Sequence, residues 1–275
     1  MSKGASVTVL VAALAALVPT RARASALSKL FSAAPAPLAI TKEFPAAGLK
    51  SIKVSVQIGN ISVAGVSGSS VTARISNDEP AFCELTAKVE GSVLKLSARG
   101  TNKWFWQADR CRADFTVSAP AGLRLKAEAG LGDVSASGLS AGADINVGSG
   151  NVRLTGVAGG VAARDGNGLV SGSVGAGNVS ADVGNGSVAL SGLEGSADIK
   201  EGDGNVRLAW AKAPELGRAD VKSGAGDVAL AFPPGAQIQA SVTSGLGAVD
   251  DAVANTAGAP FVVKVISGVG HVSIK

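Results

Sequence analysis

The segment Gly130-Leu-Gly132-Asp-Val134 is the first of five Gly-x-Gly segments that recur every 18 residues, each with an apolar residue two positions after its second glycine. The other four are Gly148-Ser-Gly150-Asn-Val152, Gly166-Asn-Gly168-Leu-Val170, Gly184-Asn-Gly186-Ser-Val188 and Gly202-Asp-Gly204-Asn-Val206. Three more copies follow at steps of 22, 21 and 23 residues: Gly224-Ala-Gly226-Asp-Val228, Gly245-Leu-Gly247-Ala-Val249 and Gly268-Val-Gly270-His-Val272. Self-similarity at such a period is typical of a solenoid, in which each repeat stacks on its neighbours.

Within a repeat, apolar and polar residues alternate. Val152 and Leu154 alternate with Asn151 and Arg153, which indicates a half-buried strand. A second alternating run of the type Ala143-x-Ile145 lies about nine residues away in each repeat. Each repeat therefore contains two short strands, and the glycines between them suit the corners because glycine adopts positive φ without a Cβ penalty.

We therefore predict an all-β protein whose main part is a β-solenoid, a single-stranded β-helix-like stack of coils of about 18–23 residues. The thin core of such a stack agrees with the frequent Val, Ala and Gly and with an aromatic content of only 4%. The predicted domains are a signal peptide (1–24), a linker (25–43), a less regular N-terminal β cap (44–120) and the Gly-x-Gly repeat solenoid (121–275).

The first residues have the features of an export signal. Lys3 supplies a positive charge, Val7 to Val18 form an apolar run, and Ala22-Arg23-Ala24 fits a cleavage site before Ser25. A cut after Ala24-Ser25-Ala26 is equally compatible, and a membrane anchor is the alternative, although the apolar run is short for a span. Removing the three cations of the leader lowers the formal charge from +4 to +1, so we expect an exported periplasmic, surface or secreted protein that binds no nucleic acid and keeps no transmembrane segment after cleavage.

Two cysteines, Cys83 and Cys111, are present. In an oxidising compartment they most simply form one disulfide, whereas two free thiols or half of a metal site are the alternatives. In the same region Cys83 to Ser97 is predicted to form a hairpin that turns at Glu90-Gly91. The loop that follows carries Trp104 and Trp106, with Arg110 close by.

This aromatic loop has two interpretations. Aromatic rings beside cations can stack on sugars, which makes Trp104, Trp106 and Arg110 possible ligand contacts. Alternatively, the rings plug the end of the stack and the disulfide holds them there. An end plug is useful because an open strand edge is a template for aggregation.

Several further segments, taken in order, carry a family resemblance. These are Gly59-Asn-Ile61, Val117-Ser-Ala-Pro-Ala-Gly122, the serial Gly-x-Gly-Asp/Asn-Val segments, Phe232-Pro-Pro-Gly235 and Ser241-Val-Thr-Ser-Gly-Leu-Gly247. Over about 44–275 the chain resembles the bacterial DUF4097 family of "putative adhesin" β-strand repeat proteins. The resemblance implies an extracytoplasmic β-solenoid-like fold without assigned catalytic residues.

A calcium-dependent repeat protein is one alternative function. Calcium-binding nonapeptide repeats place an Asp two residues after the last glycine, where this chain has Val. The polar residues come one position earlier and are interrupted by Leu169 and Ser187; they are Asp133, Asn151, Asn205 and Asp227. Asp and Asn beside Gly are expected of turns, so we predict turn chemistry here and no metal or cofactor.

A carbohydrate-active enzyme on a β-helix scaffold is the second alternative. Such enzymes need clustered carboxylates and basic residues on one face, but Lys126, Arg153 and Arg164 are scattered and His271 has no evident partner. The acidic set Asp144, Asp182, Asp198 and Asp220 is typical of a solvated sheet face. The sequence therefore favours an exported, non-enzymatic, adhesin-like binding module of the bacterial envelope, whose partner is an unknown envelope or surface protein or polysaccharide.

Overall fold

The computed structural model describes residues 38–78, 80–101, 111–251 and 255–275. Contacts divide the chain into residues 1–36 and 37–275, and the fold described below is that of the second unit. The predicted signal peptide (1–24), the linker up to residue 37 and the aromatic loop with Trp104, Trp106 and Arg110 lie outside the described residues.

The described chain is all-β, and its helical content is the single 3-10 turn η1 (Pro80–Phe82). The strands before the regular repeats are β1 (Leu38–Pro45), β2 (Ser51–Ile58), β3 (Ile61–Val66), β4 (Ser70–Asn77), β5 (Cys83–Glu90), β6 (Val93–Gly100) and β7 (Ala113–Pro120). The repeats contain β8 (Arg124–Leu131), β9 (Val134–Ser137), β10 (Ala143–Ser149), β11 (Val152–Val157), β12 (Val161–Val174), β13 (Val179–Leu193), β14 (Ala197–Asp203), β15 (Val206–Trp210), β16 (Gly217–Ala225), β17 (Val228–Ala231), β18 (Ile238–Leu246), β19 (Val249–Asp251), β20 (Phe261–Val269) and β21 (Val272–Ile274).

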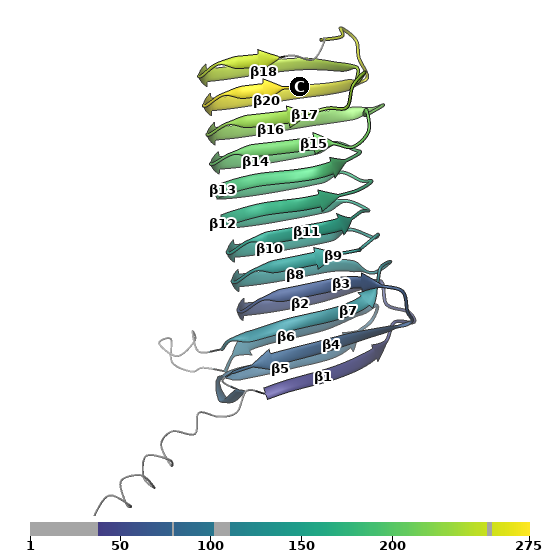
Figure 1. Cartoon of the computed structure of the whole chain (residues 1–275). Coiled ribbons are helices and arrows are strands. Elements are labelled where there is room, and N and C mark those ends of the chain that lie inside the picture. The colour runs from purple at the N-terminus through teal and green to yellow at the C-terminus, as the bar shows by residue number, and fades with distance from the viewer. Residues whose placement is uncertain (1–37, 79, 102–110, 252–254) are drawn as a thin grey trace, which may run out of the picture. The chain divides into compact units, whose positions relative to one another are not determined.

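The repeats stack in parallel register, which confirms the all-β prediction and gives a solenoid-like stack (Figure 1). We call one repeat a rung; it consists of a first strand, a glycine corner and a second strand. Ala143 pairs with Val161, Val161 with Val179 and Val179 with Ala197, so equivalent residues 18 positions apart lie in adjacent rungs. In β12 and β13 the strand continues through the corner without a break.

The glycine corners of adjacent rungs lie directly on one another. A Cβ atom built on Gly204 would lie 1.6 Å from the carbonyl oxygen of Gly186, and one on Gly226 would lie 1.5 Å from that of Gly204. Both glycines also have positive φ, at 157° and 143°. Backbones approach closely enough at this corner to exclude any side chain, so the Gly-x-Gly period marks a column of close backbone contacts.

The core is a narrow column of inward-facing aliphatic side chains. Ile145, Ala163, Ala181 and Ile199 occupy the same position in four successive first strands and are all buried. Large and small residues thus share the space between adjacent rungs, as close packing requires. Towards the C-terminal end the core becomes aromatic, in a cluster whose rings lie 4.4–6.1 Å apart and belong to Trp210, Phe232 and Phe261.

At the N-terminal end the order of strands in the stack differs from their order in the chain. The rung formed by β2 and β3 lies between β6–β7 and β8–β9, so it is a regular rung although it belongs to the predicted cap region. Beyond it, β5 pairs antiparallel with β6, and β4 pairs antiparallel with both β7 and β1. The hairpin predicted for residues 83–97 is confirmed as β5–β6.

The predicted linker ends earlier than expected, because residues from Leu38 onward form β1. Exposed and half-buried positions follow one another in this strand without a fully buried residue. It therefore lacks the alternation that identifies the other strands in the sequence. Its backbone hydrogen bonds to β4, rather than burial of its side chains, place it in the sheet.

The last two rungs are also exchanged relative to the simple order that the glycine spacing predicts. β20 and β21 lie between β16–β17 and β18–β19, so the rung of highest sequence number is the penultimate one in the stack. Phe261, Val263 and Val265 of β20 are completely buried, whereas Ala240 and Val242 of β18 are only partly buried. The exchange places the more apolar rung inside and the more polar one at the end.

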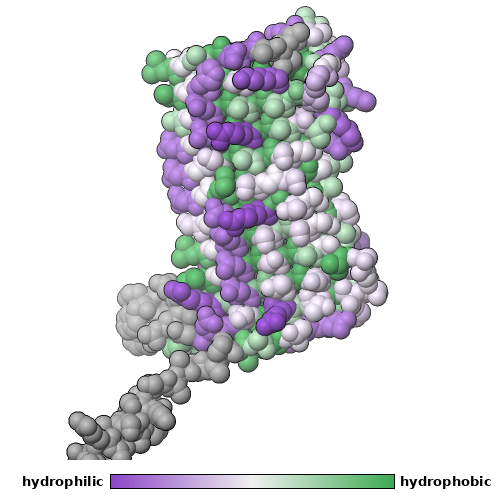
Figure 2. Space-filling view, in the orientation of Figure 1, coloured by the Kyte–Doolittle hydropathy of each residue, from purple (hydrophilic) through white to green (hydrophobic). Residues whose placement is uncertain are grey.

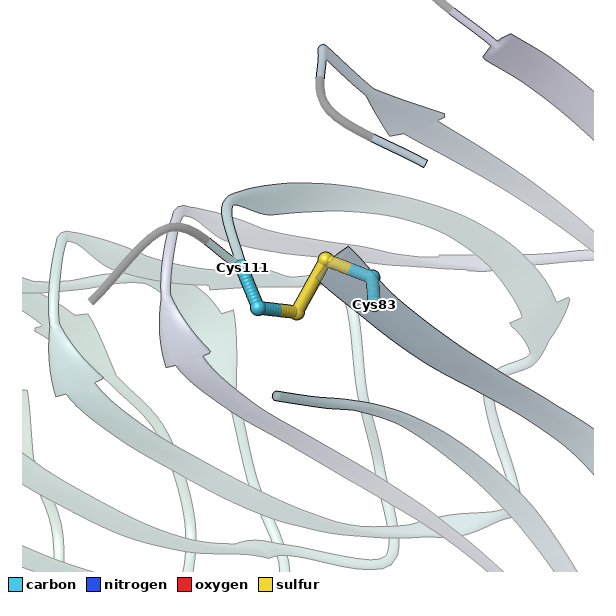
Figure 3. Close-up of a disulfide and its surroundings, with 2 residues drawn as sticks. All are labelled: Cys83 and Cys111. Atoms are coloured by element: carbon cyan, nitrogen blue, oxygen red, sulfur yellow. A yellow bond between two sulfur atoms is a disulfide. The ribbon is translucent and has the colours of Figure 1, made fainter. Parts of the chain in front are cut away.

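Cys83 and Cys111 form a disulfide with their Cα atoms 4.9 Å apart (Figure 3). Cys111 is fully buried at the entry to β7, and Cys83 begins β5. The bond therefore ties the antiparallel hairpin β5–β6 to the segment that leads into β7 at the N-terminal end of the stack.

Candidate binding surface

The outward side chains of the first strands form one continuous surface, which we call the first-strand face. In each first strand, buried and solvent-accessible residues alternate, as in β13, where Val179, Ala181 and Val183 are buried and Ser180 and Asp182 are exposed. In Figure 2 the second strands face the viewer, with hydrophilic side chains mainly along one side and paler, less polar residues beside them, and the first-strand face lies on the other side of the stack. The first-strand face is wide and flat, so it is suited to binding a partner over a large contact area.

A groove with a volume of about 890 Å³ lies on the first-strand face. Its floor consists of small residues from β12 to β14, among them Ala162, Ser180 and Ala197, together with Gly160 just before β12. Ala162 and Ser180 are paired in adjacent strands, and on either side of them the same column carries Asp144 and Asp198. Two short side chains between two longer ones create the depression.

The walls of this groove combine apolar and charged groups. Leu216 and Val262 border it and are 79% and 43% exposed, unusually high for large aliphatic side chains. Arg218 also lines it and donates to the carboxylate of Asp220, with Nε 3.0 Å from Oδ2. The groove can therefore bury apolar parts of a ligand while its rim offers charged partners.

The polar residues next to the glycine corners form a ladder of hydrogen bonds. The Oδ1 atom of Asp133 accepts from the backbone N–H of Asn151, and that of Asn205 accepts from Asp227. The Arg153 guanidinium, 2.8 Å from Asp133, lowers the pKa of this carboxyl below its usual value. These oxygens satisfy backbone donors of the adjacent rung, which is the turn chemistry that the sequence predicts.

The second acidic set lies on the first-strand face as predicted, with Asp182 exposed and Asp144, Asp198 and Asp220 partly exposed. Asp144 lies 3.9 Å from the guanidinium of Arg164, one strand away. Within the described ranges, no three Asp, Glu, His or Cys side chains come together as a metal site would require. His271 is exposed at a corner, where its backbone N–H donates to Asp227.

Among the described residues, two carboxyl groups are buried inside the stack, which the sequence did not reveal. Asp165 and Glu201 occupy an inward position of β12 and β14, in the column that holds Val147 and Val183 in neighbouring strands. Burial raises the pKa of Asp165 to about 6 and also raises the pKa of Glu201. Ser223 donates to Oε2 of Glu201 across 2.8 Å.

These buried carboxyls are unsuited to glycoside hydrolysis. The column that contains them faces the core, and both residues are at least 95% buried. A glycosidase needs its two carboxyl groups on either side of a substrate bond. Between Asp165 and Glu201 lies the side chain of Val183.

Sequence reasoning did not identify the groove, because it forms where Ala162 and Ser180 meet residues of the distant segment 216–218 and Val262. The only sequence signal is the appearance of Ala and Ser at two neighbouring positions of a column that holds charged residues on both sides, with Lys126 and Asp144 before them and Asp198 and Asp220 after them. Of the sequence-predicted residues, Cys83 and Cys111 come together. The possible ligand contacts Trp104, Trp106 and Arg110 lie outside the described residues and stay a prediction.

The stacked rungs and open outer face define an all-β, solenoid-like repeat protein with a surface suited to binding. The family model described as Toastrack DUF4097 matches residues 40–257, so the chain belongs to the DUF4097 family, and the resemblance noted in the sequence is confirmed. No functionally curated protein matches the chain. Among the described residues, no helix is long and apolar enough to cross a membrane.

Solved structures with distant similarity to this chain carry adhesin descriptions. A "putative adhesin" from Parabacteroides distasonis ATCC 8503 is 14% identical, with 88% of this chain and 98% of that one covered and a TM-score of 0.48. A "putative adhesin" from Bacteroides fragilis NCTC 9343 is 14% identical, with coverage of 86% and 97% and a TM-score of 0.40. A "putative cell adhesion protein" from Clostridium sporogenes ATCC 15579 is 13% identical, with coverage of 87% and 99% and a TM-score of 0.32. These similarities are too distant to support a function.

Proposed function

We propose that this chain is an exported, non-enzymatic binding protein of the bacterial cell envelope, and that its β-solenoid of 18–23-residue coils holds a surface partner on the first-strand face. The observation that carries this proposal is the groove of about 890 Å³ between Ala162, Ser180, Leu216 and Val262. It is open and elongated across several strands, so it fits a chain-like partner, either a polysaccharide or an extended protein segment. The ionisable groups with raised pKa values lie inside the stack.

Export is supported by the leader and by the disulfide. Residues 1–24 have the charge and hydropathy pattern of a signal peptide. The Cys83–Cys111 bond is of the kind that persists in oxidising compartments. N-terminal sequencing of the protein recovered from the periplasm or medium tests this part, and the proposal expects a mature chain that begins at Ser25 or Leu27. Recovery of the intact leader on cytoplasmic protein contradicts it.

Filling the groove tests the binding surface. The side chain of Ser180 points outward from the groove floor, so Ser180→Tyr fills the groove. Because tyrosine is favoured in strands, we expect this variant to keep the fold. The matched control is Ser62→Tyr, an exposed serine of β3 on the second-strand side. We expect Ser180→Tyr to weaken the binding of labelled protein to bacterial envelope fractions at least tenfold, and the control to change it less than twofold.

The same incubations test whether the protein is an enzyme. Purified envelope and extracellular polysaccharides are sampled for new reducing ends and for unsaturated products during binding. A non-enzymatic protein produces neither above a heat-inactivated control. Product formation by the native chain, or equal binding by both tyrosine variants, contradicts the proposal.

A further inference from the structure

A row of four lysines crosses the N-terminal end of the first-strand face. Lys88 of β5 pairs with Lys95 of β6, Lys95 with Lys53 of β2, and Lys53 with Lys126 of β8. The four residues occupy the same register position in four successive strands, although the chain visits these strands in a different order. Adjacent strands are about 4.8 Å apart, so the row is a regular line of positive charge along the axis of the stack.

Like charges directly opposite each other destabilise a sheet, so such a row needs compensation. Glu90 supplies part of it, because it forms ion pairs with Lys88 and Lys95, and these two lysines lower its pKa to about 2. Glu128 pairs with Lys53, with Nζ 2.7 Å from Oε1. Two carboxylates thus serve three of the four lysines, and all these side chains remain at least 37% exposed.

Three lysines of the row, Lys53, Lys88 and Lys95, line a hollow of about 340 Å³, and Lys126 continues the row one strand beyond it. Arg99 adds a fourth cation to it, and the hydroxyl groups of Ser55, Thr86 and Ser97 form a parallel polar column, in register with one another across β5, β6 and β2. Glu84 also lines the hollow, opposite Arg99. Cations, hydroxyls and single carboxylates therefore converge on one concave surface.

We propose that this hollow binds a linear acidic polysaccharide, with the ligand's carboxylates following the lysine row along the stack axis. Lysine ammonium groups are compact charges that can donate in several directions, which suits carboxylates on a flexible glycan. Ser55, Thr86 and Ser97 can donate to and accept from sugar hydroxyls, and Glu84 accepts from them. The interspersed carboxylates oppose denser polyanions such as nucleic acid, whose phosphates they repel.

The lysine row ends where the groove of the proposed function begins. Lys126 is followed in its column by Asp144 and then by Ala162 on the groove floor. The acidic polysaccharide site is therefore separate from the groove, and Ser180→Tyr should leave it unchanged. Failure of either proposal is thus distinguishable from failure of the other.

The experiment measures the binding of polygalacturonate to the full chain, purified with its disulfide formed, by isothermal titration calorimetry at several salt concentrations. The test variant is the double substitution Lys95→Gln/Lys126→Gln, which breaks the row at two strands. The matched control is Lys200→Gln/Lys222→Gln, which removes a second pair of facing lysines from β14 and β16 on the same face. Thermal melts establish that both variants fold.

We expect the test variant to bind polygalacturonate at least tenfold more weakly and the control to change the affinity less than twofold. Binding should weaken as salt screens the charges, and fully methyl-esterified polygalacturonate should not bind. Equal loss in both variants, or undiminished binding of the esterified polymer, overturns the proposal. Equal or tighter binding of dextran sulfate, polyphosphate or duplex DNA also overturns it, because the hollow would then be a general anion exchanger.

Discussion

At the N-terminal end of the stack, antiparallel strands β1, β4 and β5 lie beyond the parallel rungs, and the Cys83–Cys111 disulfide ties β5 to the segment that leads into β7. At the C-terminal end the outermost strands, β18 and β19, are still parallel to their neighbours, and no covalent bond holds them within the described residues. Both ends face the same problem, because an open strand edge is a template for further pairing.

The C-terminal end relies on polar groups. Asn255 accepts from the backbone N–H of Ala240 with its Oδ1 and donates to the carbonyl of the same residue, so its amide imitates one more strand. Asp251 stands in the column that holds Ile274 in the adjacent strand, which places a charge where the other rungs have an apolar or small residue. The N-terminal end is covered by antiparallel strands and cross-linked by a disulfide, whereas the C-terminal end carries polar groups that disfavour pairing with a further strand.

The regular middle between these ends should be the least tolerant of change. Gly226→Ala places a methyl group on the carbonyl of Gly204 at a positive φ, so we expect a loss of more than about 4 kcal/mol of unfolding free energy, or failure to fold. Gly122→Ala is the matched control, because nothing lies within 4 Å of its Cβ position and its φ is not positive. Chemical denaturation measures both, and a near-native Gly226→Ala variant would refute the stacked corner.

Removing the disulfide should weaken only the N-terminal end. The bond closes a loop across a sequence separation of 28 residues, for which chain entropy gives a contribution of about 3–4 kcal/mol. We expect the Cys83→Ser/Cys111→Ser variant to lose up to this amount and to keep its overall β content in circular dichroism. Hydrogen exchange should increase in β5, β6 and β7 and stay unchanged in β12 to β14. Equal loss of protection in both regions would mean that the stack unfolds as one cooperative unit.

The sequence was most informative where one interaction repeats. The corners could be predicted because each second glycine meets a backbone oxygen of the adjacent rung, so every rung needs a glycine at this position, every 18 residues in the regular repeats. The order of the last rungs could not be predicted. This order depends on which rung buries more apolar surface. Phe261 packs in the interior against the rings of Trp210 and Phe232, which belong to other parts of the chain.

The candidate site was less predictable than the fold for a related reason. The lysine row joins Lys88, Lys95, Lys53 and Lys126 in spatial order, which is neither their order in the chain nor a fixed spacing. The groove likewise depends on distant segments meeting at Ser180. A repeat period in the sequence predicts residues that recur in every rung, whereas the lysine row and the groove form where residues depart from the repeat.

Asp165 allows the middle of the stack to be tested by pH. Its pKa is about 6 in the folded protein, above the usual 3.8 of an aspartate, so between these two pH values the folded state retains a proton that the unfolded chain has lost. Its contribution to stability therefore falls as pH rises from about 4 to 6, and the penalty is complete above pH 6. We expect Asp165→Val, which restores the residue of the neighbouring rungs, to gain about 2–3 kcal/mol at pH 8 and almost nothing at pH 3.5.

The control for this substitution is Asp182→Asn, an exposed carboxyl one rung away. It should leave the pH dependence of thermal unfolding as it is in the native protein. An Asp165→Val variant that is destabilised at pH 8, or whose gain does not depend on pH, would show that the buried carboxyl is stabilised by contacts other than those to Asn167.

The smallest effect is expected at the C-terminal edge. Asn255→Ala removes the two hydrogen bonds to Ala240, which are solvent-exposed, so the loss should be about 1 kcal/mol and should be confined to increased hydrogen exchange in β18. The matched control is Asn146→Ala, an exposed asparagine in the interior of the stack, which should change neither quantity. If the Asn255 amide does protect the edge, the variant should also self-associate at high protein concentration in sedimentation experiments while the control stays native-like. A variant that loses stability without any association would mean that Asp251 alone is sufficient to keep further strands away, because a charge at an inward position cannot be buried against a second chain without a partner.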